Sequence, residues 1–166
     1  YPSLSNDDPG QPVVFGDGFP RRAGRAKFTP ARVTPPAETP DENFPMILTT
    51  GRMLEHWHTG SMPRRSGALD ALEPEASAAL HPRTLKIMGV SPGEMLRVTT
   101  RRGEITLAAR ADRAVAEDMV FIPFAFVEAA ANVLTNPLLD PWGKIPEFKF
   151  SACRVEKAGE EAVAAE

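Results

Sequence analysis

The chain has 166 residues and a formal net charge of −3, from 19 Lys and Arg against 22 Asp and Glu, which suits one domain with an attached arm. Its 42% hydrophobic and 25% charged residues are ordinary globular usage, which excludes a wholly disordered or fibrous chain. The negative balance argues against a nucleic-acid binder, no apolar run is long enough to span a bilayer, and the single cysteine excludes disulfides, cysteine-based zinc sites and self-contained iron–sulfur clusters.

Proline content sets the first boundary. Nine of the 17 prolines lie within residues 1–45, and proline fixes φ and removes a backbone donor, so a regular helix or central strand is excluded there. We interpret residues 1–44 as a Pro-rich extended arm and linker that lies along a larger body; a disordered tail is the alternative. The chain starts at Tyr1 without a Met or a leader, so we expect it to be a piece of a longer protein. The lone cysteine fits a cytoplasmic location.

A β-rich domain is expected over residues 45–157. The apolar, β-branched run at 46–50 predicts a buried strand that ends at the next glycine. A long loop with at most a short helix follows, over residues 52–75. Pro82 opens a helix, because proline is tolerated at the first helical position, and Gly89 ends it.

The clearest local pattern lies in the middle of this domain. Apolar and polar residues alternate over 96–100 and again over 105–109, with a short glycine-containing turn between them, which predicts a β-hairpin with one buried face. Further strands are predicted at 120–123 and 149–155, and residues 158–166 are expected to form a polar tail. Short strands, short helices and long loops together indicate a mainly β (α+β), barrel-like domain.

The residues that follow the first strand form a candidate binding loop. A glycine there lets backbone N–H groups approach a ligand closely, and three arginines offer planar donors for phosphate oxygens. Hydroxyls add short donors, while two histidines and a tryptophan offer flat rings for a heterocycle. The residues concerned are Thr50, Gly51, Arg52, His56, Trp57, His58, Thr59, Gly60, Ser61, Arg64 and Arg65. We interpret them as a site for a phosphorylated heterocyclic cofactor; the alternative is an exposed loop whose arginines pair with Glu55, Asp70 or Glu73.

Two residues farther along could complete such a site. Asn132 carries a donor and an acceptor on one amide, the pair that recognises the edge of a heterocycle, although a cap or turn residue is the alternative. Lys149 is either a point charge for phosphate or a residue of the strand surface. A metal ion on the two loop histidines is disfavoured, because the chain offers too few other soft ligands. The sequence has no nucleophile elbow or phosphate-loop motif, Cys153 is expected to be a buried, inert thiol, and no catalytic residue is assigned.

A series of short sequence strings runs from residue 50 to residue 149, and the arm from Val14-Phe15 through Phe19-Pro20 to Gly24-Arg25-Ala26-Lys27-Phe28 carries further matching residues. The strings are Thr50-Gly51-Arg52, His56-Trp57-His58-Thr59-Gly60-Ser61-Met62, Arg64-Arg65, His81-Pro82, Arg101-Arg102-Gly103-Glu104, Phe121-Ile122-Pro123-Phe124, Asn132-Val133-Leu134-Thr135, Asp140-Pro141 and Gly143-Lys144-Ile145-Pro146-Glu147-Phe148-Lys149. In this order they closely resemble the C-terminal molybdopterin-dinucleotide-binding domain of the large subunit of molybdenum formate dehydrogenases, within the dimethyl-sulfoxide-reductase superfamily.

The resemblance implies a double-psi β-barrel and a bis(molybdopterin guanine dinucleotide) cofactor with molybdenum or tungsten. The residues it assigns to cofactor contacts are Thr50, Gly51, Arg52, His56, His58, Thr59, Gly60, Ser61, Asn132 and Lys149. It places iron–sulfur clusters, NAD or another acceptor, and electron-transfer subunits in the rest of a complex that oxidises formate to carbon dioxide. The metal ligand and cluster cysteines of the family lie in upstream domains of the same subunit, so this chain alone is predicted to be inactive.

Two other functions remain open at this stage. The same domain occurs in periplasmic nitrate reductases and other molybdopterin oxidoreductases, although the ending at 144–149 favours formate. A non-catalytic barrel that docks a partner through the Pro-rich arm is the alternative from a different class. The cofactor assignment depends on one expectation: Arg52 and Asn132 should converge on the same crevice rather than lie on opposite sides of the barrel.

Overall fold

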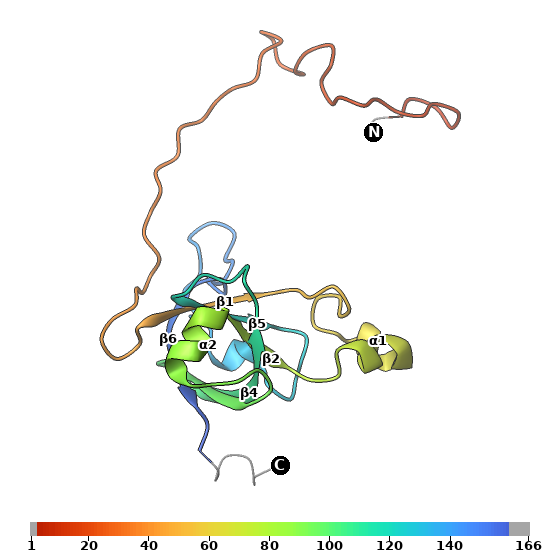
Figure 1. Ribbon diagram of the computed structural model, residues 1–166. Helices are drawn as coiled ribbons and strands as arrows, with labels where there is room; N and C mark the ends of the chain where they lie inside the picture. Colours follow the sequence, from red (N-terminus) through yellow and green to blue (C-terminus); the bar gives the residue numbers. More distant parts are fainter. Residues whose placement is uncertain (1–2, 160–166) are drawn as a thin grey trace. The chain divides into compact units, whose positions relative to one another are not determined.

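The computed structural model describes residues 3–159, and its contacts divide the chain into two units, one ending at Pro35 and the other beginning at Pro36 (Figure 1). Residues 3–35 form turns and extended backbone and contain no helix or strand within that range. The rings of Phe15 and Phe19 contact each other at a centroid distance of 5.0 Å, but Phe28 is 95% exposed. The first unit is therefore ordered by local turns rather than by a hydrophobic core.

The second unit is a closed, six-stranded barrel. Its strands are β1 (Met46–Gly51), β2 (Ser77–Leu80), β3 (Met95–Thr99), β4 (Glu104–Ala111), β5 (Met119–Pro123) and β6 (Ser151–Lys157). Around the barrel they follow the order β1-β5-β2-β4-β3-β6, with β1–β5 and β2–β4 parallel and the remaining neighbours antiparallel. The mixed, closed barrel confirms the predicted fold class.

The barrel interior is filled by side chains that alternate along the strands. Leu96 and Val98 of β3 and Leu107 and Ala109 of β4 point inward and are at most 4% exposed, which confirms the predicted hairpin and its buried face. The other core residues that are essentially inaccessible include Leu48, Ala78, Leu80, Leu85, Val120, Ile122, Leu134 and Cys153. Closure removes the open edges that a sheet would otherwise expose.

Short helices fill the connections between the strands. They are η1 (Pro63–Arg65) and α1 (Gly67–Leu72) between β1 and β2, α2 (Pro82–Met88) between β2 and β3, and η2 (Ala131–Val133) between β5 and β6. The helix predicted from Pro82 to Gly89 is confirmed: the ring Nδ1 of His81 accepts a hydrogen bond from the Arg83 N–H (3.1 Å), and Gly89 ends the helix in the left-handed region (φ 66°). Leu85 anchors α2 on the core.

Two strands differ from the sequence prediction. No strand was predicted at β2, because its Ser-Ala-Ala-Leu segment is poor in β-branched and aromatic residues; its parallel pairing with β4 and antiparallel pairing with β5 make it a strand. The closing strand begins at Ser151 rather than at Lys149 and continues to Lys157. Of the polar tail predicted at 158–166, the part from residue 160 onward lies outside the described residues.

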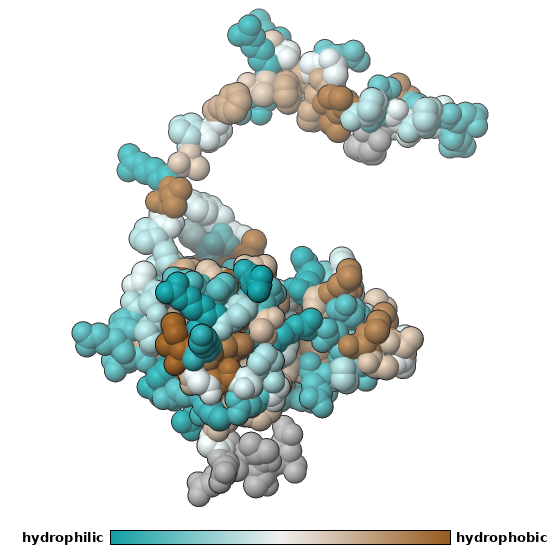
Figure 2. All heavy atoms as spheres, in the orientation of Figure 1, coloured by the Kyte–Doolittle hydropathy of each residue, from teal (hydrophilic) through white to brown (hydrophobic). Residues whose placement is uncertain are grey.

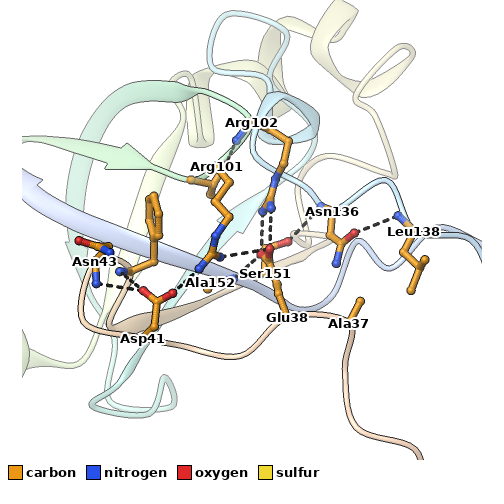
Figure 3. A network of polar contacts seen from close by, with 12 residues as sticks. Ala37, Glu38, Asp41, Asn43, Arg101, Arg102, Asn136, Leu138, Ser151 and Ala152 are labelled. Carbon is orange, nitrogen blue, oxygen red and sulfur yellow. Dashed lines mark hydrogen bonds and ion pairs between the residues drawn. The ribbon is translucent and has the colours of Figure 1, made fainter.

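The segment Pro36–Phe44, which precedes β1, is fastened to the barrel by polar contacts (Figure 3). The Ala37 N–H donates to the carboxylate of Glu147 (3.1 Å), and the carboxylate of Glu38 accepts from the Ala152 N–H (2.7 Å). The carboxylate of Asp41 pairs with the guanidinium of Arg101. The boundary between arm and domain was expected after residue 44. These bonds attach the segment Pro36–Phe44 to the barrel unit, which begins at Pro36.

The surface of the barrel unit carries separate hydrophobic areas. Figure 2 shows one over α2, where Ile87 is 77% exposed, and another at α1, where Leu72 is 67% exposed. None of the helices in residues 3–159 has the length and apolar character needed to cross a membrane.

Candidate functional site

The end of β1 is held by three close contacts. Gly51 lies against Phe121 of β5, and a Cβ added at this glycine would be 2.5 Å from the ring Cε2. The hydroxyl of Thr50 donates to the carbonyl oxygen of Phe148 (2.7 Å), and the ammonium of Lys149 donates to the carbonyl oxygen of Thr50 (2.6 Å). Ring packing therefore requires the glycine, while Thr50, which is 2% exposed, fastens the strand end and places Lys149 beside it.

Lys149 also lies over aromatic rings. Its ammonium is 5.4 Å from the ring centroid of Phe148 and 6.0 Å from that of Phe124. The N–H of Phe124 donates to the carbonyl oxygen of Gly51 (3.1 Å), so the ring is attached to the same strand end. Ring faces attract a cation at this range. The positive charge is therefore held at the edge of the barrel where β1 and β5 both end.

The candidate binding loop keeps Arg52 exposed but oriented. Its Nε donates a long hydrogen bond to Nδ1 of His58 (3.4 Å), and its guanidinium carbon lies 5.7 Å from the ring centroid of Trp57. The rings of Trp57 and His58 meet edge to face at 4.5 Å. His58 adopts a left-handed backbone conformation (φ 51°), which is uncommon for a residue with a Cβ and more frequent at functional sites.

Gly60 fixes the far side of this loop. Its φ is 72°, and an added Cβ would be 2.7 Å from the carbonyl oxygen of Ala125. Its own carbonyl accepts a hydrogen bond from the Arg64 N–H (3.0 Å). Only glycine combines this φ with such a close backbone approach. The neighbouring Thr59 and Ser61, both exposed, therefore flank a fixed point of the loop.

His56 lies inside the loop instead of facing its exposed groups. The residue is 0% exposed, its Nε2 is 2.6 Å from the carbonyl oxygen of Glu73, and its ring meets Phe126 edge to face at 5.4 Å. Since a carbonyl can only accept, Nε2 carries the proton. Nδ1 is buried and has no hydrogen-bond partner among residues 3–159. In this conformation His56 holds the loop together from within.

The cations of the loop differ in how they are neutralised. Arg64 forms ion pairs with Asp70 (3.2 Å) and Glu128 (2.6 Å), and its pKa is raised chiefly by the hydrogen bond to Glu128. Within residues 3–159, neither Arg52 nor Arg65 forms an ion pair, and the same holds for the ammonium of Lys149. The alternative that the loop arginines are neutralised by nearby carboxylates therefore applies to Arg64. Unneutralised positive charge at the strand end can hold an anionic group.

A cavity of about 190 Å³ lies between the loop and η2. It is lined by Thr59, Phe124, Phe126, Val127, Ala130, Ala131 and Asn132. The cavity offers aromatic faces, one hydroxyl and one amide, which together suit the edge and face of a flat heterocycle. Because ligand pockets usually measure about 300–1,000 Å³, this cavity can receive one part of a large cofactor.

Asn132 and Thr59 both line this cavity, but Arg52 does not, so the expected convergence of Arg52 and Asn132 on one crevice stays a prediction. Arg52 contacts His58, the residue that precedes the cavity residue Thr59 in the chain. Lys149 is connected through Phe124, whose ring lies near the ammonium and also lines the cavity. Of the other predicted residues, Thr50 and His56 are buried and hold the strand end and the loop from within.

Sequence reasoning quoted Phe124 but did not assign it to the site. It directly follows β5, which pairs in parallel with β1, so the two strand ends meet at the same edge of the barrel. That parallel pairing is the signal that would have joined Phe124 to Gly51, and it cannot be derived from alternation along one strand.

The remaining candidates for chemistry are few. Cys153 is fully buried on β6, and burial, with a smaller contribution from the charge of Glu38, raises the pKa of its thiol to about 12. A thiol with this pKa is a weak nucleophile and a poor metal ligand near neutral pH. Residues 3–159 contain no group of three or more His, Cys, Asp or Glu side chains placed to hold a metal ion. The arrangement offers cationic donors, an amide and ring faces, the groups that an anionic heterocycle would contact.

Comparison with known proteins gives a family match over the barrel. A family model described as "Molydopterin dinucleotide binding domain" (molybdopterin in the usual spelling) matches residues 46–152. Acetylene hydratase from Pelobacter acetylenicus is structurally similar, with a TM-score of 0.62 at 22% identity, over 69% of this chain and 18% of that one. At this identity the structural likeness speaks to the fold alone.

Curated relatives match almost the whole chain. The F420-dependent formate dehydrogenase subunit alpha of Methanocaldococcus jannaschii is 40% identical over 157 residues, and F420-dependent formate dehydrogenase 1 subunit alpha of Methanococcus maripaludis is 38% identical over 157 residues. Each match covers 95% of this chain but 23% of the relative, so the chain spans about a quarter of their length. Their names specify F420, whereas NAD or another acceptor was expected from the sequence.

Proposed function

Because this chain belongs to the molybdopterin dinucleotide binding domain family, we propose that it holds a molybdopterin guanine dinucleotide, with molybdenum or tungsten, at the barrel edge where β1 and β5 end. The observation that supports this most is the combination of two unneutralised cations with a small aromatic cavity. Arg52 and Lys149 offer charge-assisted donors for phosphate oxygens, and Asn132 offers its amide to a heterocycle edge. These donors match an anionic dinucleotide that carries flat rings.

The other residues of the predicted site have supporting roles in this proposal. The exposed hydroxyls of Thr59 and Ser61 add donors, and His58 orients the Arg52 guanidinium. Gly51 and Gly60 let neighbouring groups pack at distances that a Cβ would prevent. Thr50 and His56 act from inside, through the hydrogen bonds that close the strand end and the loop. The chain therefore binds and orients the cofactor, and the reaction takes place on groups supplied by the cofactor and other domains.

We further propose that the complete protein is a formate dehydrogenase. The chemistry that the bound cofactor would supply is the oxidation of formate to carbon dioxide, a proton and two electrons. The names of the relatives favour F420 over NAD as the electron acceptor, with iron–sulfur clusters, the upstream domains of the subunit and electron-transfer subunits as partners. The chain alone should show no formate-dependent dye reduction, because its one cysteine is sealed inside the barrel.

The test uses the 166-residue chain and three probes: GDP, CDP and inorganic pyrophosphate, titrated by calorimetry. We expect saturable binding with GDP tightest, and Arg52→Gln and Lys149→Met should each weaken it by about tenfold, since a charge-assisted hydrogen bond contributes roughly 1.5–3 kcal/mol. Arg113→Gln is the matched control: this exposed arginine lies before β5 begins, whereas the site lies where β5 ends.

Each outcome has a distinct meaning. Equal binding of all three probes would retain the phosphate site and refute the guanine assignment. Absence of saturable binding, or equal losses in Arg52→Gln and Arg113→Gln, would refute the proposed cofactor site. Dye reduction with formate by the purified chain would refute the assignment of chemistry to other domains.

A further inference from the structure

Glu38 lies at the centre of a polar network (Figure 3). In the chain it precedes residues 46–152, which match the family model. Its carboxylate accepts two hydrogen bonds from Arg102, from Nη1 at 2.6 Å and Nη2 at 2.8 Å, and one from the Ala152 N–H at 2.7 Å. Arg101 approaches the same carboxylate at 3.2 Å. The side chain is 16% exposed, and its pKa is lowered first by the Arg102 hydrogen bond and then by the Ala152 N–H and the arginine charges.

Arg102 connects this carboxylate to η2. Its Nη2 also donates to the carbonyl oxygen of Leu134 (3.1 Å), and its Nε lies 3.4 Å from the same oxygen. Leu134 is 0% exposed and ends η2, where its own N–H donates to the Ala131 carbonyl oxygen (3.0 Å). One guanidinium therefore bridges a carboxylate from the segment before β1 and the carbonyl of Leu134, the residue that caps the end of η2.

The turn that carries Arg102 also packs against η2 directly. A Cβ added to Gly103 would be 2.7 Å from Cγ1 of Val133. The turn is closed by the Thr100 N–H, which donates to the Gly103 carbonyl oxygen (2.9 Å). The hydroxyl of Thr135 donates to the Asn132 carbonyl oxygen (3.2 Å) on the other side. The backbone around Asn132 is therefore contacted from both sides, by the turn at Val133 and by the Thr135 hydroxyl at its own carbonyl.

Arg102 is poorly suited to bind phosphate itself. Its donors already serve Glu38 and Leu134, and its side chain is 22% exposed. The Asn132 amide shows the opposite arrangement: the residue is exposed, lines the cavity, and its side-chain amide forms no hydrogen bond within residues 3–159. The donors of Arg102 are therefore occupied within the protein, whereas the Asn132 amide is free to contact a ligand in the cavity.

We propose that Arg102, held by Glu38, is a positioning residue that fixes η2 and so presents the Asn132 amide to the cofactor. This inference rests on the proposed function, because the Asn132 amide is the group assigned there to a heterocycle edge. It also extends the functional unit of the barrel upstream to Pro36, since Glu38 lies outside residues 46–152 that match the family.

The experiment combines NMR of the ¹⁵N-labelled chain with GDP titration. The variants are Arg102→Gln, Glu38→Gln and Arg102→Lys; Arg97→Gln is the matched control, because it removes the exposed Arg97–Glu156 pair (3.4 Å) on β3. Without probe, Arg102→Gln and Glu38→Gln should shift or broaden the Asn132 backbone and side-chain amide signals, and Arg97→Gln should not. Lys at 102 keeps the charge but cannot serve both acceptors, so Arg102→Lys should give an intermediate effect.

A double-mutant cycle separates positioning from a general loss of stability. Asn132→Ala and Arg102→Gln should each weaken GDP binding by about fivefold, and the double variant should be no weaker than either single one. Additive losses, or unchanged Asn132 signals in folded Arg102→Gln and Glu38→Gln, would overturn the inference. If none of the probes binds the unaltered chain, the proposed cofactor site fails, and the probe-free Asn132 signals still decide the positioning role.

Discussion

Replacing Gly51 with alanine tests what the strand-end glycine does. The new Cβ would lie 2.5 Å from Cε2 and 3.0 Å from Cζ of Phe121, well inside ordinary carbon–carbon contact, so the half-buried ring must move. Overpacking costs about 1–3 kcal/mol, and replacing glycine where φ is compatible returns about 0.4–1 kcal/mol, which gives a net loss of about 1–2 kcal/mol in the free energy of unfolding. Urea denaturation followed by far-UV circular dichroism measures this loss.

A second substitution makes the reasoning refutable. Phe121→Leu removes the two ring atoms that the new methyl would meet, so Gly51→Ala should cost about 1 kcal/mol less in that background than in the unaltered chain. A loss below about 0.5 kcal/mol for Gly51→Ala alone, or an equal loss in both backgrounds, would show that ring packing is not the reason for the glycine.

Three further predictions concern the residues behind the site. Glu38→Gln should lower the free energy of unfolding at pH 7 by about 2 kcal/mol, between the values for exposed and buried ion pairs. Because the pKa of Glu38 is lower in the folded chain than its ordinary value of 4.5, its stabilisation is complete above that pH and is lost as the pH falls through the folded pKa; denaturation at several pH values should show the two chains converging in acid. A chain of residues 36–166 should be as stable as the full chain, whereas one of residues 46–166 should lose about 2 kcal/mol in thermal unfolding, and equal stability would contradict the role of Pro36–Phe44. Cys153 should react with a thiol reagent at pH 8 roughly a thousandfold more slowly than a free cysteine, because its pKa is about 12, and fast labelling of the native chain would contradict its burial.

Local signals in the sequence were sufficient for most of the elements. Alternation identified the β3–β4 hairpin, and Pro82 and Gly89 marked both ends of α2. Each of these signals depends on only a few neighbouring residues, so the element can be predicted without knowledge of the rest of the fold. The strand β2 lacked such a signal, because alanine has little intrinsic preference for strands and only its neighbours in the barrel make it one.

The candidate site likewise contains features that the sequence predicts and features that only the structure reveals. Residue chemistry singled out the loop after β1, Asn132 and Lys149, since guanidinium, ammonium, hydroxyl and amide groups are recognisable without coordinates. Whether His56 faces a ligand or the interior, and whether Arg64 is free or paired, depends on partners such as Glu73 and Glu128 that the sequence does not identify as neighbours.

The amino-acid sequence by itself determined the β-rich class, the extent of the barrel strands with local patterns, and the kinds of donor gathered near the end of β1. Only the tertiary structure decided that β1 and β5 run parallel, that Phe124 lies near Lys149 and also lines the cavity of Asn132, and that Glu38 pairs with Arg102. The physical reason is separation along the chain: Glu38 and Arg102 are 64 positions apart, and a contact at that separation is set by the packing of the whole barrel.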